Sequence, residues 1–351
     1  MTTCAAVSTG TSWPAQCLAL SLRPRRQPRR DRRAESAVSR DCCTISDHAE
    51  LDRAAAVSQG TLYTSCRERV GAASYPVMQR VRRPLRNPVA VGQEKRSRDG
   101  VFSGMRVATW NVARPVPSAR RRRKLVAGQI QAVEADVWVL TETHDDVGPG
   151  PEYRSASTSG ADRASGPGER WVSIWSRFPI EPLPSTSDPV RAVAARIAPA
   201  RGTPLIVYGT VLPWLGSSWR GIEAVDGKAF EAALDVQAAD WRAIRRIHPD
   251  HDLMVAGDFN QDLADTHYYG SRANRLRLTA ALQQADLIAL TASGDDPVRR
   301  GSPTNACIDH VCVSEALRRR CRSVHRWPDT PRPDRRMSDH FGIAVEFSPA
   351  G

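Results

Sequence analysis

The chain has 351 residues, and 41% of them are hydrophobic, so it can bury the core of one large domain or of two average domains. No stretch reaches the ~18 to 20 consecutive apolar residues that a membrane-spanning helix needs, and the first residues lack the charged start and apolar segment of a secretory signal. We therefore expect no membrane span and a cytoplasmic location. The sequence leaves the oligomeric state open.

Positive charge is concentrated in the first third of the chain. The net charge is +12, and residues 1–104 hold 18 Arg and Lys against 9 Asp and Glu. This segment includes RPRRQPRRDRR (Arg23–Arg33) and shows neither helical nor strand periodicity. We predict a disordered basic tail over residues 1–104 and a globular domain over residues 105–349. The tail is either a solvated extension, such as a stretch translated upstream of a true start at Met105, or a basic arm that helps to hold polyanions.

Cysteine usage argues against disulfide bonds. Five of the eight cysteines lie in the tail, and Cys307, Cys312 and Cys321 lie beyond it. These three form no CxxC pair and have no histidines at zinc-finger spacing. We expect them to be reduced thiols that pack as small apolar side chains.

From Met105 onward, alternating and apolar runs predict an α/β pattern. The predicted strands cover residues 105–112, 136–144, 171–180, 190–198, 203–214, 253–260, 306–314 and 342–347. Helical spacing predicts helices from Ser118, as the N-terminal cap, to about Val133, and over residues 227–247 and 272–285. The run RRRRK (Arg120–Lys124) is interpreted as a solvated first turn. Consecutive strands without intervening helices favour two sheets packed face to face, with helices outside, over a Rossmann alternation.

Polar side chains lie at the ends of three predicted strands and within a fourth. They are Asn111, Glu142, Asp258 with Asn260, and Asp309. A fifth group, Ser338-Asp339-His340, precedes the last strand. Carboxylates at the edge of a core are costly unless a partner compensates their charge, and a divalent cation is the simplest partner. Because oxygen ligands and a histidine occur without a thiolate cluster, Mg²⁺ or Mn²⁺ is favoured over Zn²⁺.

Six motifs occur in the order and approximate spacing of the endonuclease/exonuclease/phosphatase superfamily. They are WN at Trp110, LTETH with Glu142, SRFPI from Ser176, GDFN from Gly257, IDHVCVS from Ile308 and SDH from Ser338. Residues from about Met105 to Phe347 therefore resemble this superfamily, which includes pancreatic-type DNases, abasic-site endonucleases, inositol polyphosphate phosphatases and neutral sphingomyelinases. The resemblance implies a four-layered α/β/β/α sandwich of two mixed sheets, with the site on one rim.

The resemblance also implies a metal site for phosphoester hydrolysis. Glu142 would be the main ligand of Mg²⁺ or Mn²⁺, with Asn111 and Asp339 close by, and the metal would offset charge on the phosphate oxygens. Taken alone, Asn111 is also compatible with a capping residue, and Glu142 with an exposed side chain at a strand end.

Four further residues carry the implied catalytic roles. Asp258 would orient and deprotonate the attacking water, and Asn260 would contact the phosphate or place the nucleophile. His340 would donate to a non-bridging phosphate oxygen, with Asp309 holding its imidazole in one tautomer. Taken alone, Asp258 and Asn260 are equally compatible with a turn after a strand. His310 is assigned a structural role, because it would point to the opposite face of its strand from Asp309.

One position departs from the superfamily pattern. Where an imidazole that binds phosphate is expected, in a pattern like NTHL, this chain has GTVLPW, with Val211 at that position. Either another group replaces the imidazole or the substrate is held differently. The candidates for substrate contact are Arg272 and Tyr269 after GDFN, and Trp214 after Val211. The alternative for the aromatic side chains is packing on the core.

The expected activity is metal-dependent hydrolysis of a phosphodiester, as in a nuclease, with DNA and RNA among the candidate partners. A phosphatase acting on a small or lipid-linked phosphomonoester is the alternative, and a binding protein with a degenerate site is a third reading. Residues 105–351 hold 32 Arg and Lys against 29 Asp and Glu, so their charge favours nucleic acid only weakly. A steep loss of DNA affinity with added salt would favour the nuclease.

Overall fold

The computed structural model describes residues 104–159, 166–199, 202–265, 267–302 and 304–349. The predicted disordered tail, apart from Gly104, lies outside the described residues. Within the described ranges, no helix combines the length and apolar character needed to cross a membrane.

The described strands form two six-stranded sheets. The first has the order β11-β12-β1-β2-β4-β3, with the bounds Cys321–Trp327, Gly342–Phe347, Met105–Asn111, Val137–His144, Glu169–Ser176 and Arg154–Ser157. The second has the order β5-β6-β7-β8-β10-β9, with the bounds Ile180–Pro182, Ala192–Ile197, Leu205–Val211, Asp252–Asp258, Asp309–Ser314 and Leu287–Ala289. Strands β1 and β2 are parallel, as are β7 and β8, whereas the other neighbours are antiparallel. Both sheets are therefore mixed.

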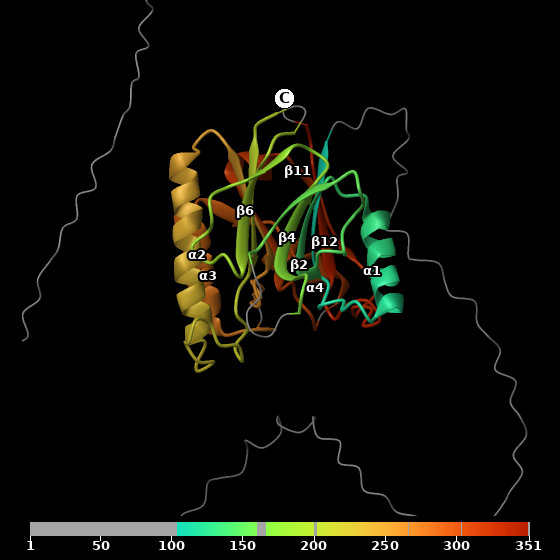
Figure 1. Ribbon diagram of the computed structural model, residues 1–351. Coiled ribbons are helices and arrows are strands. Elements are labelled where there is room, and N and C mark those ends of the chain that lie inside the picture. Colours follow the sequence, from blue (N-terminus) through green and yellow to red (C-terminus); the bar gives the residue numbers. More distant parts are fainter. Residues whose placement is uncertain (1–103, 160–165, 200–201, 266, 303, 350–351) are drawn as a thin grey trace, which may run out of the picture. The chain divides into compact units, whose positions relative to one another are not determined.

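Helices cover the outer faces of both sheets (Figure 1). Helix α1 (Arg120–Val133) packs on the first sheet, while α2 (Lys228–Ile247) and α3 (Arg272–Gln284) pack on the second sheet, on the opposite side of the domain. The shorter helical elements are η1 (Ser293–Asp295), α4 (Pro297–Gly301) and α5 (Glu315–Arg319). The layers follow the order helix, sheet, sheet, helix, which confirms the predicted α/β/β/α sandwich.

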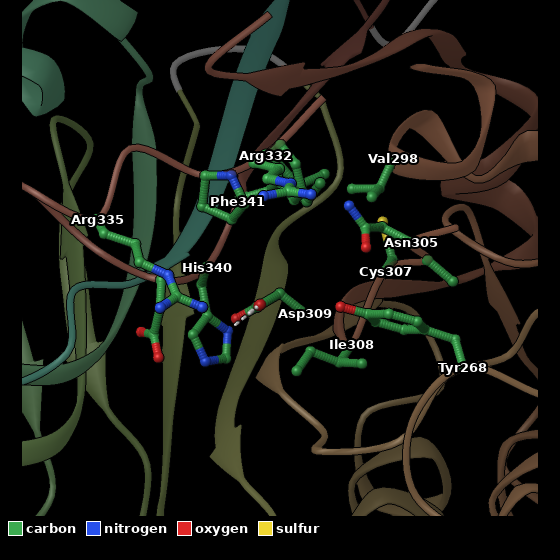
Figure 2. A pocket seen from close by; sticks show the side chains of 14 residues that line it. Tyr268, Val298, Asn305, Cys307, Ile308, Asp309, Arg332, Arg335, His340 and Phe341 are labelled. Atoms are coloured by element: carbon green, nitrogen blue, oxygen red, sulfur yellow. Dashed lines mark hydrogen bonds and ion pairs between the residues drawn. The ribbon is translucent and has the colours of Figure 1, made fainter. Parts of the chain in front are cut away.

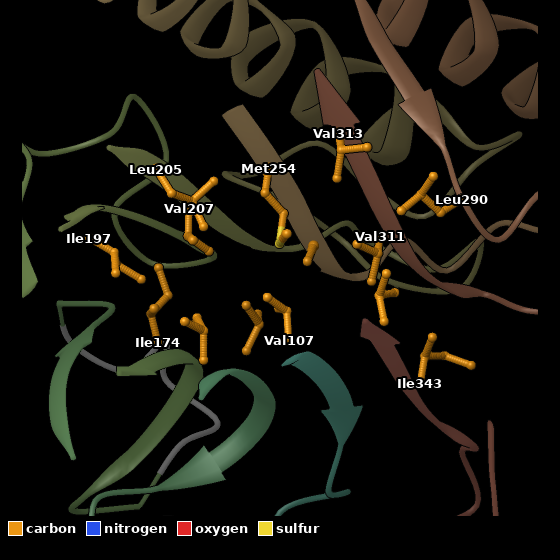
Figure 3. Close-up of a cluster of buried hydrophobic side chains, with 14 of the residues drawn as sticks. Val107, Ile174, Ile197, Leu205, Val207, Met254, Leu290, Val311, Val313 and Ile343 are labelled. Atoms are coloured by element: carbon orange, nitrogen blue, oxygen red, sulfur yellow. The ribbon is translucent and has the colours of Figure 1, made fainter. Parts of the chain in front are cut away.

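Branched aliphatic side chains fill the space between the sheets (Figure 3). Val107 and Ile174 of the first sheet belong to the same buried cluster as Val207 and Val311 of the second. Two further apolar clusters fix α1 on the first sheet and α2 with α3 on the second. Because both faces of each sheet are covered by apolar contacts, carboxylates are less costly at the strand ends than on the sheet faces.

Each sheet contains a parallel pair of strands joined by a helix, and this connection brings several strand ends to one rim. Helix α1 joins β1 to β2, and α2 joins β7 to β8. The carboxyl ends of β1 and β8 lie close together, as the hydrogen bond from Asn111 to Asp258 shows. Strands β10 and β12 run antiparallel to β8 and β1, so they begin at this same rim.

The structure corrects several predicted boundaries. Ser118 does not cap α1, because Ala119 occupies the cap position and no side chain bonds there. The strand predicted over residues 171–180 is two strands, β4 and β5. Ser176 Oγ accepts the backbone N–H of Phe178 at 3.0 Å, and Pro179 has no N–H to continue the ladder.

Three edge strands were not predicted. Strand β3 reads RSAS and β11 reads CRSVHRW, and both strands, like β9, lie at a sheet edge. An edge strand buries few side chains, so its apolar periodicity is too weak to stand out in the sequence.

Gly257 should be intolerant of a side chain. Its φ is +140°, and a Cβ at this position would collide with the carbonyl oxygen of Thr210 on the neighbouring strand β7. We expect Gly257→Ala to lower the free energy of unfolding by about 2 to 4 kcal/mol. Gly128→Ala is the control, because a Cβ there meets nothing within 4 Å and Ala favours the helix by roughly 0.5 to 1 kcal/mol. Urea denaturation compares the two variants, and equal stability of Gly257→Ala and the wild type would contradict the close approach.

Candidate active site

A paired histidine and carboxylate lie at the centre of the rim. Asp309 opens β10 and His340 lies just before β12, and His340 Nδ1 is 2.6 Å from Asp309 Oδ2 (Figure 2). Trp110 Nε1 donates to the carbonyl oxygen of His340 at 3.2 Å, and Ser338 Oγ accepts the backbone N–H of His340 at 3.0 Å. The imidazole is therefore fixed both through its ring and through its backbone.

The surrounding carboxylates keep this imidazole positively charged. Burial by itself lowers the pKa of His340, but the charge and hydrogen bond of Asp309, with Asp258 and Asp339 nearby, raise the pKa to about 10. An imidazolium can donate to a developing oxyanion at neutral pH. The second oxygen of Asp309, Oδ1, is buried and has no hydrogen-bond partner among the described residues, so it can accept one more group.

Asp258 faces Asp309 across the ladder between β8 and β10 and is only 1% exposed. Its Oδ1 accepts the backbone N–H of Asn260 at 2.9 Å, and its Oδ2 accepts the side-chain amides of Asn111 and Asn260 at 2.9 and 3.1 Å. Burial and the charge of Asp309 nevertheless raise the pKa of Asp258 to about 7. A carboxylate with this pKa exchanges a proton near neutral pH, as a general base must.

Two asparagines hold the carboxylates of the rim in place. Asn111 Nδ2 also donates to Glu142 Oε1 at 3.3 Å, and its Oδ1 accepts the backbone N–H of Ala113 at 2.8 Å. The amide of Asn260 donates to a backbone carbonyl at 3.0 Å in addition to Asp258. In this arrangement Asn111 bridges Glu142 and Asp258, and Asn260 orients Asp258.

Glu142 lies at the rim end of β2 in a strained backbone conformation. Its φ is +46°, in the left-handed region that costs a non-glycine residue roughly 1 to 3 kcal/mol. Its side chain is 25% exposed, and Arg114 Nε lies 3.4 Å from its Oε2. Such strain persists where the surrounding structure requires one particular placement of a side chain.

Two polar anchors tie the loops of the site together. Ser338 Oγ donates to the carbonyl oxygen of Asn111 at 2.6 Å. Arg122 of α1 donates from Nη2 to the carbonyl oxygens of Val112–Ala113 and from Nε to that of Met337, each at 2.8 Å. The interpretation of RRRRK as a wholly solvated turn is therefore wrong for Arg122. A basic run carries no sequence signal that would show which of its members turns inward.

The donor atoms at the rim fit a hard divalent cation. Asp258, Asp309 and His340 offer potential ligand atoms that lie within 4.8 Å of one another, and Glu142 adjoins them through Asn111. The raised pKa of His340 keeps its ring protonated, so the carboxylate oxygens are the available ligands. Oxygen ligands without a thiolate match Mg²⁺ or Mn²⁺.

A cavity of about 510 Å³ opens beside the histidine and carboxylate pair (Figure 2). Asp309 and His340 lie on its wall, together with Tyr268, Arg332 and Arg335. Its volume is within the range of small-molecule sites. The sequence analysis missed the two arginines, because they lie in the segment PRPDRR, which matches no motif.

Of the three residues predicted to contact substrate, one lies near the candidate site and two are exposed outside the cavity. Tyr269 lies near Asp258 and Asp339, and burial, with the charges of these carboxylates, raises its pKa. Arg272 is exposed on the first turn of α3, and Trp214 is 51% exposed after β7. Neither of these two lines the cavity beside His340.

Val211 and His310 lie next to residues of the candidate site. Val211 is buried at the end of β7 and pairs with Asp258 in the parallel ladder, so the expected imidazole position lies beside the candidate base. His310 is fully buried, with Nδ1 2.7 Å from Thr291 Oγ1 and Nε2 2.9 Å from the carbonyl oxygen of Gln261. Burial lowers the pKa of His310, as in a neutral histidine of a core.

Two solved structures show a similar fold. The endonuclease domain of TRAS1, a telomere-specific non-LTR retrotransposon, is 16% identical over 71% of this chain and 100% of that chain, with a TM-score of 0.50. The AP endonuclease LMAP from Leishmania major is 14% identical over 70% of this chain and 88% of that chain, with a TM-score of 0.53. A search of curated proteins finds no significant match.

Two packed mixed sheets with carboxylates and a histidine at one rim define a class of four-layered sandwich proteins. A profile of the Endonuclease/Exonuclease/phosphatase family matches residues 108–340, which is more than half of the chain. The protein belongs to the Endonuclease/Exonuclease/phosphatase family.

Removing the inward-facing arginine of the basic run should loosen the rim. We expect Arg122→Gln to destabilise the protein by about 1 to 3 kcal/mol, because three backbone carbonyl groups lose a charged donor. The exposed neighbour Arg121 provides the control, and Arg121→Gln should change stability by no more than ~0.5 kcal/mol. Urea denaturation gives the stabilities, and hydrogen exchange should show faster exchange at the amide of His340. Identical behaviour of the two variants would refute the anchoring role of Arg122.

Proposed function

We propose that this protein is a divalent-metal-dependent phosphoesterase that hydrolyses a phosphodiester by in-line attack of an activated water. The observation that carries the proposal is the proximity of His340, its partner Asp309 and the buried Asp258, whose potential ligand atoms lie within 4.8 Å of one another at one rim. This group combines a donor for a negatively charged oxygen with a base for water, which are the two functions that phosphoester hydrolysis requires.

The cation belongs on the Glu142 side of this group. Glu142 and its hydrogen-bond partner Asn111, with Asp339 near His340, would hold Mg²⁺ or Mn²⁺, which would offset charge on the phosphate oxygens when bound. Asn111 Nδ2 donates to the carboxylates of both Glu142 and Asp258. The side-chain oxygen of Asn111 would therefore face a cation at these carboxylates only after the amide rotates.

Side chains of the protein would activate the water and stabilise the charge on the phosphate oxygens. Asp258, with a pKa near 7, accepts the proton of the attacking water, and the amide of Asn260 keeps its carboxylate oriented. His340 donates to a non-bridging oxygen as negative charge grows there, and Asp309 keeps the ring charged and in place. The charge of His340 persists through neutral pH, so the donor needs no prior protonation step.

The substrate class divides into two candidates. The two structures with a similar fold are both named as endonucleases, which supports a nucleic acid. The cavity beside His340, with Arg332 and Arg335 on its wall, favours instead a compact phosphate ester whose organic group fills it. Phosphodiesterase activity is the first proposal, and phosphatase activity on a small or lipid-linked phosphomonoester is the second.

Hydrolysis should depend on the metal and on Glu142. Plasmid DNA, an abasic-site duplex, RNA and several phosphomonoesters should be incubated with the full chain in Mg²⁺ or Mn²⁺. We expect turnover of at least one substrate, its loss with EDTA, and a fall of at least ~10²-fold in Glu142→Ala. Glu181→Ala, which removes an exposed carboxylate of β5 in the second sheet, is the control and should keep wild-type turnover. Turnover that persists in EDTA would refute the metal dependence.

Loss of the imidazolium should act on kcat. We expect His340→Ala to lower kcat by roughly 10² to 10⁴-fold, because the transition state loses its charged donor. Asp309→Asn should also lower kcat, since it removes the charge that keeps the ring protonated. His325→Ala, on β11, is the control. A near-normal kcat in His340→Ala would exclude His340 from the chemistry.

A further inference from the structure

Two arginines that no motif singles out stack on one tryptophan at the rim. The guanidinium carbon of Arg114 lies 4.3 Å from the ring centre of Trp171, and that of Arg191 lies 4.2 Å from it. Arg114 also pairs with Glu142 at 3.4 Å, whereas Arg191 is 6% exposed and donates to Ser217 Oγ at 3.2 Å. Trp171 thus gathers two positive charges beside the carboxylate that is the candidate metal ligand.

Arg191 lies beside the position where the expected imidazole is missing. Its carbonyl oxygen accepts the backbone N–H of Val211 at 2.9 Å, next to the ladder pair Ala192 and Thr210. Residues directly opposed on antiparallel strands place their side chains on the same face of a sheet. Val211 and Trp171 both belong to the cluster between the sheets, so the Arg191 side chain occupies the face to which position 211 points.

The contacts form a closed circuit around the candidate site. Starting from Asp258, they pass through Val211, Arg191, Trp171, Arg114, Glu142 and Asn111 and return to Asp258. The two arginine side chains therefore belong to the same chain of contacts as Asp258, the candidate base, and Glu142, the candidate metal ligand.

The backbone that presents Arg114 is strained in the same way as Glu142. Ala113 and Arg114 have φ values of +50° and +51°, so two consecutive non-glycine residues are left-handed. Asn111 Oδ1 accepts the N–H of Ala113, and the N–H of Arg114 donates to the carbonyl oxygen of Glu142 at 2.7 Å. Strain that is held by dedicated hydrogen bonds is typical of side chains whose placement serves function.

We propose that Arg114 and Arg191, stacked on Trp171, bind the non-bridging oxygens of the reacting phosphate and take the role of the imidazole absent at position 211. The proposal deepens the proposed function and rests on it in placing a substrate phosphate at this rim. A guanidinium matches phosphate oxygens with paired N–H donors, and stacking on an indole restricts its motion before the ligand arrives. The pair recognises the phosphate itself, and so it serves diesters and monoesters alike.

Inorganic phosphate, a product-like probe, tests the pair without requiring turnover. Calorimetric titration of the full chain, with and without Mg²⁺, should give a dissociation constant that rises at least ~10-fold in Arg114→Gln and in Arg191→Gln. Arg191→Lys, which keeps the charge without the planar fork, should fall between wild type and Arg191→Gln. Arg246→Gln, an exposed site at the end of α2, is the control and should bind as the wild type does.

A catalytically inactive variant separates this proposal from the proposed function. Asp258→Asn should bind phosphate at least as tightly as the wild type, because it removes a negative charge and leaves both arginines. Arginine-dependent phosphate binding in a protein that hydrolyses no ester would refute the proposed function and keep the anion site. If Arg114→Gln and Arg191→Gln still hydrolyse the ester and bind phosphate as tightly as the wild type, the arginine site is refuted and the proposed function stands.

Three results would overturn the arginine pair. They are an unchanged dissociation constant in Arg114→Gln and Arg191→Gln, an equal loss in Arg246→Gln, and absence of phosphate binding by the wild type. Circular dichroism establishes that each variant is folded. Should the buried Arg191→Gln fail to fold, Arg114→Gln decides, because the Arg114 side chain is 32% exposed and its replacement leaves the core intact.

Discussion

Two buried carboxylates that face each other across a β-ladder, Asp258 and Asp309, are the constraint on which the site depends. Burial first, and then the like charge of Asp309, raise the pKa of Asp258 to about 7. His340 compensates one carboxylate, and the amides of Asn111 and Asn260 compensate the other. The compensation is incomplete, since Asp309 Oδ1 has no partner among the described residues. The unpaired carboxylate oxygen can accept a hydrogen-bond donor or a cation.

The fold brings the charged side chains together at the rim and also holds the loops that carry them. Apolar side chains cover both faces of each sheet, so the polar ends of β1, β2, β8, β10 and β12 converge on one rim. The loops that carry them are then tied across the rim by Ser338 and Arg122, which bind backbone carbonyl groups from distant parts of the chain. Precise placement of charged groups therefore depends on neutral backbone contacts around them.

Sequence alone predicts the parts of this arrangement that leave a local signature. The buried strands and the long helix α2 are visible as periodic apolar runs, and the strand ends are marked by motifs such as GDFN. The edge strands β3, β9 and β11 are not visible, because little of their surface is buried. The split between β4 and β5 depends on a single turn at Ser176 and Pro179, which interrupts an otherwise uniform apolar run.

The same distinction explains which candidate site residues the sequence predicts. Asp258, Asp309 and His340 lie within recognisable short motifs, and the structure brings all three together. Arg122 and Arg191 carry no such signature, because their importance comes from partners in space: the carbonyl groups of two loops and the ring of Trp171. A missing motif residue, such as the imidazole at position 211, therefore does not by itself indicate a missing interaction. A residue beside a neighbouring strand can bring a positive charge close to the same position, since Arg191 is hydrogen-bonded through its backbone to Val211.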